Sequence, residues 1–337
     1  MHDSEGMHKI YDSWPEIAND SYHSEYEPVD FGPISHIVFT GMGGSGALGE
    51  IFKAILSKTP MSVTLVKGYT LPKTVNSTTL VVATSVSGNT DETNTTLHSA
   101  KQLTKNIIAF SSGGKMREYC KENGLEHRTV PLFHSPRASF PGFLYSMLKV
   151  LEPLIPIKEE QIDESIKKLQ TFSEKIDSSN LTRENPSLDL AQWVTGIPVI
   201  YYPYGLEAAA IRFKNSLQEN AKTQAIAEDV IEACHNGIVP WEKPSIVQPI
   251  LIQGDEDNLK TKERWIILKQ FFNESNINYK EVHSLKGGIL TKLINLIYLL
   301  DYSSIYRAVL AGTDPSPVKS IDYVKKKLST NLAELVT

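Results

Sequence analysis

Cysteine is scarce in this sequence, long apolar runs are lacking, and the charge is nearly balanced; each feature excludes a class of protein. The 2 cysteines, Cys120 and Cys234, lie far apart without metal-ligand spacing, which argues against a disulfide-stabilised fold and favours a reducing, cytoplasmic compartment. No stretch approaches the ~18 consecutive apolar residues of a membrane-spanning helix, and the first residues lack the pattern of a signal peptide. The net charge of −5 is spread along the chain, which argues against nucleic-acid binding.

The remaining composition is that of an ordinary globular protein. Hydrophobic residues make up 41% of the 337 positions and charged residues 22%, and a chain of this length typically forms about two domains of ~150 residues. Short repeats and low-complexity tracts are also missing from the sequence. Composition therefore excludes membrane, fibrous and disordered classes without indicating a function.

Short apolar runs rich in β-branched residues alternate with helical patterns from residue 36 onwards. We expect strands at 36–40, 62–66, 79–84, 106–110, 126–130, 198–202, 249–253 and 279–283. Helices are expected at 47–56, around 97–103, and at 115–123, 206–222, 261–274, 290–310 and 317–335. Continuous apolar strands that alternate with helices predict parallel sheets covered on both faces, hence an α/β fold.

The pattern predicts two such α/β units in tandem. Residues 1–152 would form a polar and aromatic N-terminal leader without clear periodicity, followed by the first unit. Residues 153–185 read as a charged helical connector, and residues 186–337 as the second unit with an amphipathic C-terminal helix.

A glycine-rich turn follows the first expected strand. Gly41, Gly43 and Gly46 satisfy G-x-G-x-x-G between a strand and a helix, which is the setting of a dinucleotide-binding turn. That interpretation also requires an acidic residue at the end of the second strand, but Val66 is followed by Lys67. The sequence therefore argues against a nicotinamide-dependent oxidoreductase, and we expect no cofactor.

A second loop, at 84–93, carries several hydroxyl groups around a glycine at the end of the third strand. Ligands bind at this edge of open α/β sheets. Asn89 and Glu92 fit a capping pair, so the next helix is expected to begin here and to direct its free N–H groups at the hydroxyls. The predicted phosphate-binding groups are Gly44, Ser45, Ser85, Ser87 and Thr90. The alternative is a solvated Ser/Thr turn that only caps a helix.

These loops resemble those of the sugar isomerase (SIS) domain family. The resemblance lies in the glycine turn, the hydroxyl loop and Ser-Ser-Gly-Gly-Lys at 111–115. More narrowly, segments 135–140, 215–222, 234–236, 314–317 and 321–325 are similar to the bifunctional phosphoglucose/phosphomannose isomerases. The similarity runs from about residue 35 to 330 and departs at Gly237, where the family commonly has an acidic residue.

The resemblance implies two tandem SIS-type, flavodoxin-like domains and an aldose–ketose isomerase. Such an enzyme interconverts glucose 6-phosphate and mannose 6-phosphate with fructose 6-phosphate through a cis-enediol, without a metal or cofactor. It also implies a cytoplasmic homodimer acting in glycolysis and gluconeogenesis, with hexose 6-phosphates as the small-molecule partners and no nucleic acid or membrane. The alternative is a non-catalytic SIS regulator that senses sugar phosphates, although no helix-turn-helix pattern precedes residue 35.

Four catalytic roles follow from the same resemblance. Glu219 would be the base that moves the proton, and Arg137 the cation that stabilises the enediolate. His235 would open the sugar ring from the facing subunit, and Lys325 would assist at the ring oxygen, with Lys319 as the alternative lysine. On the residues alone, each of these side chains also fits a solvated or purely structural position.

The helix at 206–222 gives the base a local setting. Ala210, Phe213, Leu217 and Ala221 form an apolar stripe, whereas a second face carries Arg212, Asn215, Glu219 and Lys222. This second face fits either an active-site wall or a solvated surface with a Glu219–Lys222 pair.

Overall fold

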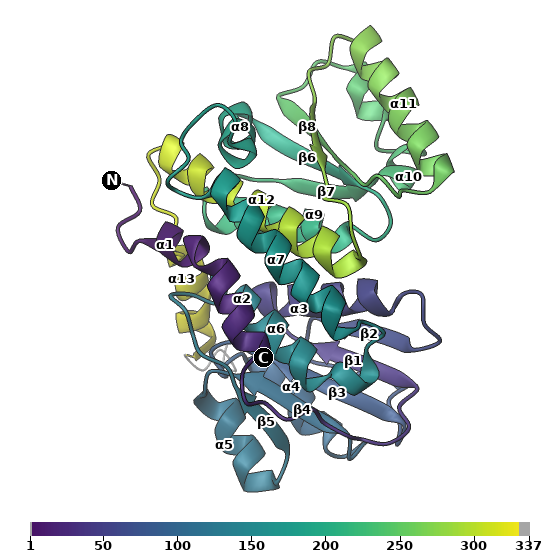
Figure 1. The fold of residues 1–337 in the computed structure, drawn as a ribbon, viewed down its shortest axis with the longest axis vertical. Coiled ribbons are helices and arrows are strands. Elements are labelled where there is room, and N and C mark those ends of the chain that lie inside the picture. The colour runs from purple at the N-terminus through teal and green to yellow at the C-terminus, as the bar shows by residue number, and fades with distance from the viewer. Residues whose placement is uncertain (1, 330–337) are drawn as a thin grey trace, which may run out of the picture.

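Two parallel sheets are stacked in the computed structural model, which describes residues 2–329 (Figure 1). The first is five-stranded with the order β2-β1-β3-β4-β5, and the second is four-stranded with the order β7-β6-β8-β9. Every strand pair is parallel. The predicted α/β fold with parallel sheets is therefore confirmed.

The first sheet is built from residues 36–129. Its strands are β1 (His36–Thr40), β2 (Ser62–Val66), β3 (Thr79–Thr84), β4 (Ile107–Ser111) and β5 (Glu126–Thr129). The connecting and flanking helices are α3 (Gly43–Leu56), α4 (Asp91–Ala100), α5 (Gly114–Asn123) and α6 (Phe140–Val150). Strands β1, β3 and β4 are buried throughout, which is why they read as continuous apolar runs rather than alternating ones.

The second sheet follows after the helices α7 (Glu159–Ile176) and α8 (Pro186–Trp193). Its strands are β6 (Ile197–Tyr202), β7 (Ile226–Asp229), β8 (Val247–Gln253) and β9 (Lys280–His283). The accompanying helices are α9 (Glu207–Glu219), α10 (Val230–Ala233), α11 (Leu259–Glu274), α12 (Ile289–Leu310) and α13 (Lys319–Ser329). Short 3₁₀ turns occur at Glu152–Leu154 and Val239–Glu242.

Helices of both halves form the layer between the sheets. Helix α3 packs on α9, and α12 contacts α7, α8 and α9, as their places in Figure 1 suggest. The main apolar core runs without interruption through residues of both halves. The predicted limits of the two domains, at 152 and 186, therefore stay a prediction.

The N-terminal leader forms two helices, α1 (Met7–Asp12) and α2 (Trp14–Tyr22), which the sequence analysis did not predict. Tyr11 and Trp14 are fully buried, and their rings stack at a centroid distance of 4.5 Å. The Tyr298 hydroxyl of α12 donates to the Tyr11 carbonyl at 2.7 Å, and its ring stacks on Trp14 at 5.3 Å. The leader is therefore part of the core between the two halves.

Several other boundaries differ from the sequence prediction. Helix α3 begins at Gly43, inside the expected turn, and α4 ends at Ala100. Helix α6, helix α8 and strand β7 were not predicted. Of the expected helix 317–335, the described part runs from Lys319 to Ser329, and residues 330–337 lie outside the described residues. Within residues 2–329, no helix has the length and apolarity needed to cross a bilayer.

Candidate active site

A cavity of about 750 Å³ lies where the end of α9 meets the start of α3 and the segment 313–321. Glu219 and Lys222 line it at the end of α9, and Gly43 lines it at the start of α3. Gly43 has a φ of +52°, a backbone conformation in which an L side chain is strained. The cavity thus joins the glycine turn of the first sheet to the helix that follows the central strand of the second.

Arg137 lies beside Glu219. Its guanidinium Nη1 donates to Glu219 Oε2 at 3.4 Å, and its Nε donates to Asn220 Oδ1 at 2.6 Å. Its Nη2 donates to the carbonyls of Pro315 and Ser316 at 2.7 and 2.8 Å. Arg137 is 6% exposed, so a buried, always charged group is fixed next to a carboxylate at the cavity. The predicted base and the predicted cation are thus brought together.

A buried ion pair behind Arg137 holds its backbone. Arg212 Nη2 donates to the Arg137 carbonyl at 2.8 Å and to Asp301 Oδ2 at 2.6 Å, while Arg212 Nε also reaches Asp301 Oδ2 at 2.9 Å. Ser216 Oγ donates to the other Asp301 oxygen at 2.7 Å. Burial raises the pKa of Asp301, and the Arg212 charge opposes that shift. Arg212 is 2% exposed and faces the core, so the solvated-surface alternative is wrong for this side chain, whereas Arg212 and Glu219 both contact Arg137.

Lys222 closes the end of α9 in a way the sequence did not indicate. It has a φ of +54°, and its Nζ donates to the carbonyl of Glu219 at 2.8 Å and to that of Asp314 at 2.9 Å. Burial and the nearby Arg137 charge lower the pKa of Lys222. The side chain thus ties α9 to the segment before α13 through backbone oxygens, instead of forming the side-chain pair with Glu219 expected for a solvated face.

The predicted phosphate groups gather at the carboxyl ends of β1 and β3. Ser45 Oγ accepts from the Val86 N–H at 3.3 Å, which joins the glycine turn to the hydroxyl loop. Ser85 Oγ lies 2.9 Å from Thr90 Oγ1, and Ser87 Oγ accepts from the Asn89 N–H at 3.2 Å. A β-carbon on Gly44 would lie 3.5 Å from the Pro136 carbonyl, so this turn also adjoins the Arg137 loop.

The expected capping pair at the start of α4 is wrong. Thr90 is the N-cap residue, and within the described residues no side chain caps this helix. The Asn89 amide instead bridges two loops, since its Oδ1 accepts from the Lys115 N–H at 3.1 Å and its Nδ2 donates to the Ser87 carbonyl at 3.1 Å. The first N–H groups of α4 are therefore left for another acceptor.

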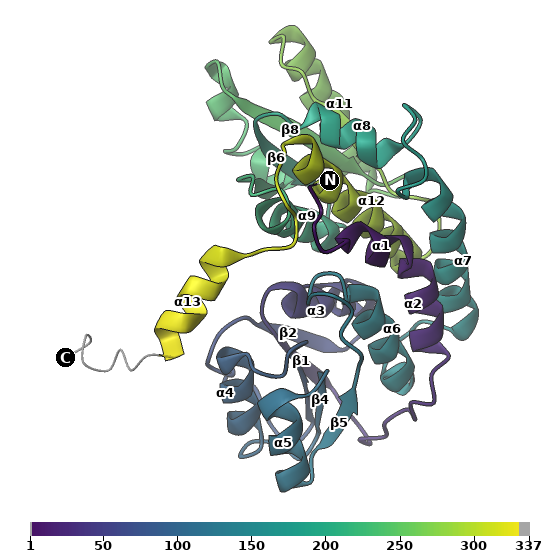
Figure 2. The ribbon, with the colours of Figure 1, turned by 90° about the vertical axis from the view of Figure 1, so that its left-hand side faces the viewer.

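His235 and the two candidate lysines lie in different surroundings. His235 is exposed and follows α10, which lies beside α11 at the far end of the second sheet in Figure 1. The chain therefore does not bring it to Glu219. Lys319 lines the cavity, whereas Lys325 is exposed further along α13. Figure 2 shows α13 projecting away from both sheets.

The departure at Gly237 has a structural counterpart that the sequence analysis missed. A β-carbon on Gly237 would lie 2.5 Å from both carboxylate oxygens of Glu228, on strand β7. Burial, together with the Glu232 and Asp229 carboxylates, raises the pKa of Glu228. A carboxylate therefore occupies the space beside the His235 segment even though position 237 has no side chain. A strand prediction for 226–229 would have revealed this neighbour.

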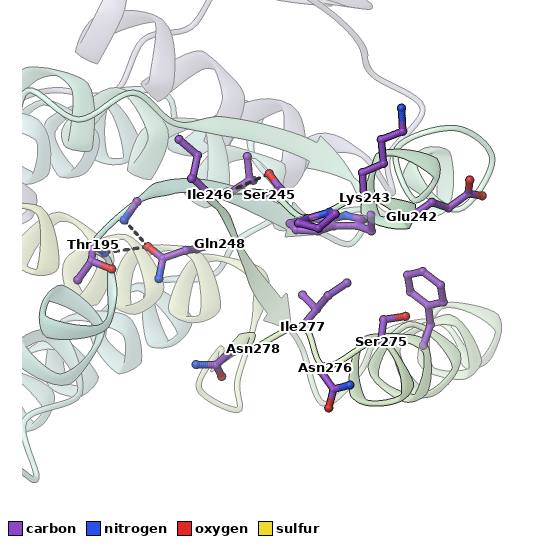
Figure 3. A pocket seen from close by; sticks show the side chains of 15 residues that line it. Thr195, Glu242, Lys243, Ser245, Ile246, Gln248, Ser275, Asn276, Ile277 and Asn278 are labelled. Carbon is purple, nitrogen blue, oxygen red and sulfur yellow. Dashed lines mark hydrogen bonds between the residues drawn. The ribbon is translucent and has the colours of Figure 1, made fainter.

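A larger cavity, of about 990 Å³, lies at the edge of the second sheet where its strands begin (Figure 3). Its walls come from residues just before β6, β8 and β9, among them Thr195, Ile246 and Asn278. Gln248 Oε1 already accepts from the N–H groups of Thr195 and Gly196, at 2.8 and 2.5 Å. Because open parallel sheets bind ligands at the carboxyl ends of their strands, we place the active site in the 750 Å³ cavity instead.

Potential metal ligands do not cluster in the described residues. Across residues 2–329, no group of three or more His, Cys, Asp and Glu side chains is arranged to hold a metal ion. Both cysteines are free thiols, and burial raises the pKa of Cys120 to about 11.

Comparison with known proteins supplies the family. Residues 183–328 match the model of the bacterial phospho-glucose isomerase C-terminal SIS domain, and residues 33–121 match that of the SIS domain. A bifunctional phosphoglucose/phosphomannose isomerase from Caldicellulosiruptor bescii is 34% identical, over 88% of this chain and 90% of that protein. A D-glucosamine-6-phosphate 4-epimerase from Sulfolobus acidocaldarius is 31% identical, over 74% of this chain and 78% of that protein.

Solved structures extend the likeness to the whole fold. A hypothetical protein from Thermus thermophilus superposes with a TM-score of 0.74 at 14% identity, covering 98% of this chain and 91% of that one. The sequence resemblance to SIS domains is thereby confirmed in both halves. The chain belongs to the SIS-domain family of bifunctional phosphoglucose/phosphomannose isomerases.

Proposed function

We propose that this protein is an aldose–ketose isomerase that interconverts glucose 6-phosphate and mannose 6-phosphate with fructose 6-phosphate. One observation carries the proposal: Glu219 and the buried guanidinium of Arg137 lie 3.4 Å apart at a cavity that also borders the glycine turn. A carboxylate beside a fixed cation is the pair that proton transfer through an enediolate requires.

The reaction moves one proton between two neighbouring carbons. The Glu219 carboxylate removes the proton from C2 of the open-chain aldose, and the electrons pass to the C1 oxygen to give an enediolate. Arg137 stabilises the developing negative charge, and the proton of the C2 hydroxyl passes to the C1 oxygen. Glu219 then returns its proton to C1 as the C2 carbonyl forms, which gives the ketose. Glucose and mannose 6-phosphates differ only at C2 and share this planar intermediate, so one base can act on both.

The substrate phosphate is assigned to the loops after β1 and β3. Gly44, Ser45, Ser85, Ser87 and Thr90 are the proposed groups. Support comes from the hydrogen bond that joins the two loops and from the start of α4, where no side chain of the described residues caps the helix. A phosphate at this point gains from N–H donors and the helix dipole without a cationic side chain.

The proposed enzyme works as a homodimer in which the facing subunit supplies His235. Support comes from the exposed position of His235, away from the cavity of its own chain. A second argument is the face of α13 that carries Ile321, Val324 and Leu328, which are 38%, 53% and 56% exposed. These residues recur at helical spacing on a helix that stands away from the body (Figure 2), and a second copy of the chain would cover them.

A lysine on α13 is assigned the role of assisting ring opening at the ring oxygen. Lys325 is the match by resemblance, whereas Lys319 lines the cavity of its own chain. Exchanging each lysine for Met separates them, because the residue that assists ring opening affects turnover of cyclic substrate while the other leaves it unchanged. As part of the same proposal, the protein acts in the cytoplasm in glycolysis and gluconeogenesis, which is consistent with two free thiols.

A coupled assay with each hexose 6-phosphate tests the function. We expect turnover of glucose 6-phosphate and mannose 6-phosphate to fructose 6-phosphate, and no turnover of glucosamine 6-phosphate. Binding of these sugars without any turnover would instead identify the protein as a sugar-phosphate sensor. Chelation with EDTA should leave turnover unchanged, and its loss would reveal a required metal ion.

A further inference from the structure

A second cavity, of about 550 Å³, lies at the carboxyl edge of the second sheet. Segments after β6 (203–206), after β8 (254–258) and before α12 (287–288) line one side of it. The end of α3, at residues 54–58, lines the other side. This edge is where open α/β sheets bind ligands, and the proposed isomerase chemistry does not use it.

The cavity corresponds to the active site through an internal repeat. Strands β1, β2, β3 and β4 have the same order in their sheet as β6, β7, β8 and β9. In each sheet the first strand of this set leads into a long helix, α3 or α9, and these two helices pack on each other. The end of α9 reaches the cavity of the first sheet, and the end of α3 reaches that of the second.

Two helices begin at this second cavity. Helices α9 and α12 have 13 and 22 residues, and among the described side chains none caps either start. The two starts adjoin, since a β-carbon on Gly205 would lie 4.0 Å from Ile289 Cδ1. Their free N–H groups and helix dipoles thus favour an anion at the same place.

A buried hydroxyl without a partner lies behind the wall of this cavity, beside Gly254. Ser284 is 7% exposed, and its Oγ has no hydrogen-bond partner among the described residues. This oxygen lies 3.5 Å from the position of a β-carbon on Gly254, a residue of the cavity wall. Buried hydroxyls are almost always hydrogen-bonded, so Ser284 leaves the segment behind this wall one polar partner short.

Lys292 provides a cation in the first turn of α12. Its side chain is 12% exposed and forms an ion pair with Glu256, whose side chain is 73% exposed. Lys58, at the end of α3, also lines the cavity, and together with Lys292 it lowers the pKa of Glu256. An exposed carboxylate that neutralises a buried ammonium group occupies the place that the anion of a ligand would take.

The other two acidic groups of the loop after β8 are already engaged. Asp257 Oδ2 accepts from the Gly254 N–H at 3.1 Å and from Trp265 Nε1 at 3.0 Å. Asp255 pairs with Lys286 at 3.4 Å. These contacts hold the loop after β8 in place, so displacement of Glu256 alone opens Lys292 to a ligand.

We propose that this cavity is a second anion site that binds the phosphate group of a sugar phosphate without converting the sugar. The residues that α3 contributes to its wall are Ala54, Ile55, Ser57 and Lys58. Of the described residues, the end of α3 therefore brings a lysine to the second cavity, whereas the end of α9 brings the Glu219 carboxylate to the first. Binding here does not depend on turnover at the first site.

Calorimetric titration of the full-length chain with fructose 6-phosphate tests the proposal. The Glu219→Gln background prevents turnover during the titration. We expect two binding sites per chain, and one site after the further exchange Lys292→Met. The matched control is Lys286→Met, an exposed lysine paired with Asp255 outside the cavity wall, which should leave both sites intact. A single site per chain before the Lys292 exchange would overturn the proposal, as would two sites after it.

Glu256→Gln gives a second test that does not weaken the cavity wall. Because this side chain is exposed, the variant should fold normally, and removal of the internal competitor should tighten the second site about 10-fold. Unchanged affinity at the second site would contradict the displacement of Glu256. Inorganic phosphate as competitor then tests which part of the ligand is held: we expect competition at the Lys292-dependent site, and its failure would contradict binding through the phosphate group.

Discussion

The carboxyl edges of the two sheets share one topology and differ in chemistry. The first edge presents glycines and hydroxyls after β1 and β3, and Glu219 of α9 faces it beside Arg137. The second edge presents an acidic loop after β8 and Lys292 on α12, and Lys58, which follows α3, lies opposite. The repeated fold thus produces two cavities, and the residue at the end of the facing helix decides which of them carries a base.

Removing that base gives the largest expected effect. Glu219→Gln makes the first cavity resemble the second, which has no carboxylate on the facing helix. We expect kcat to fall at least ~100-fold with little change in phosphate affinity, because a positioned base contributes ~10²–10⁴ to the rate. The coupled assay measures kcat, and Glu207→Gln at the other end of α9 is the control. Near-normal turnover in Glu219→Gln would exclude this residue as the base.

Disrupting the Arg212–Asp301 ion pair behind the first cavity gives the next largest effect. Arg212→Met leaves the Asp301 carboxylate buried and unpaired, which typically costs ~3–5 kcal/mol in the free energy of unfolding. It also frees the Arg137 carbonyl, so kcat should fall together with stability. Denaturant unfolding and the coupled assay measure the two effects. Arg212→Lys should recover part of the stability and less of the turnover, because a single ammonium group cannot bridge Asp301 and the Arg137 carbonyl in the same way.

The hydroxyl loop should affect binding more than chemistry. Ser87→Ala removes one proposed phosphate donor from the first edge, and we expect KM to rise about 10-fold with little change in kcat. Ser99→Ala, at the other end of α4, is the control because its hydroxyl only donates to the Thr95 carbonyl. A KM that stays unchanged in Ser87→Ala would move the phosphate site elsewhere.

The smallest effect concerns β5, the strand that has no counterpart in the second sheet. Burial, with the nearby Arg117 and Arg128, lowers the pKa of His127 to about 4, from an ordinary value of 6.5. The unfolded chain therefore binds this proton more readily, so stability should decrease as the pH falls from about 6.5 to about 4. Denaturant unfolding across this range measures the slope. His127→Asn should flatten it, and an unchanged slope would assign it to other groups.

Local pattern predicted the buried strands well, because β1, β3 and β4 are apolar along their whole length. Local pattern did not predict the elements whose structure depends on tertiary packing. Helix α6 is buried along nearly its whole length, so its almost continuous apolar sequence does not distinguish a helix from a strand. Strand β7 is short, partly polar and lies at the sheet edge. The leader helices pack on α6, α7 and α12, and no local window contains these contacts.

The residues of the candidate site were likewise predicted only in part from the sequence. Segments 135–140 and 215–222 indicated Arg137 and Glu219, and the structure brings both to one cavity. Helical periodicity placed Arg212 beside Glu219, but it could not reveal the Asp301 partner 89 residues later that draws Arg212 into the core. The Glu228 carboxylate that fills the space beside Gly237 was missed for a different reason, because strand β7, which carries it and lies close in sequence to Gly237, was not predicted.

The contact between the leader and α12 has a consequence for biosynthesis. Tyr11 and Tyr298, which share a hydrogen bond, are separated by 287 positions. Translation is vectorial, and domains generally fold as their segments leave the ribosome. The leader is therefore translated long before α12. Trp14 meets Ala138 and Phe140 first, whereas the hydrogen bond between Tyr11 and Tyr298 forms only when α12 follows.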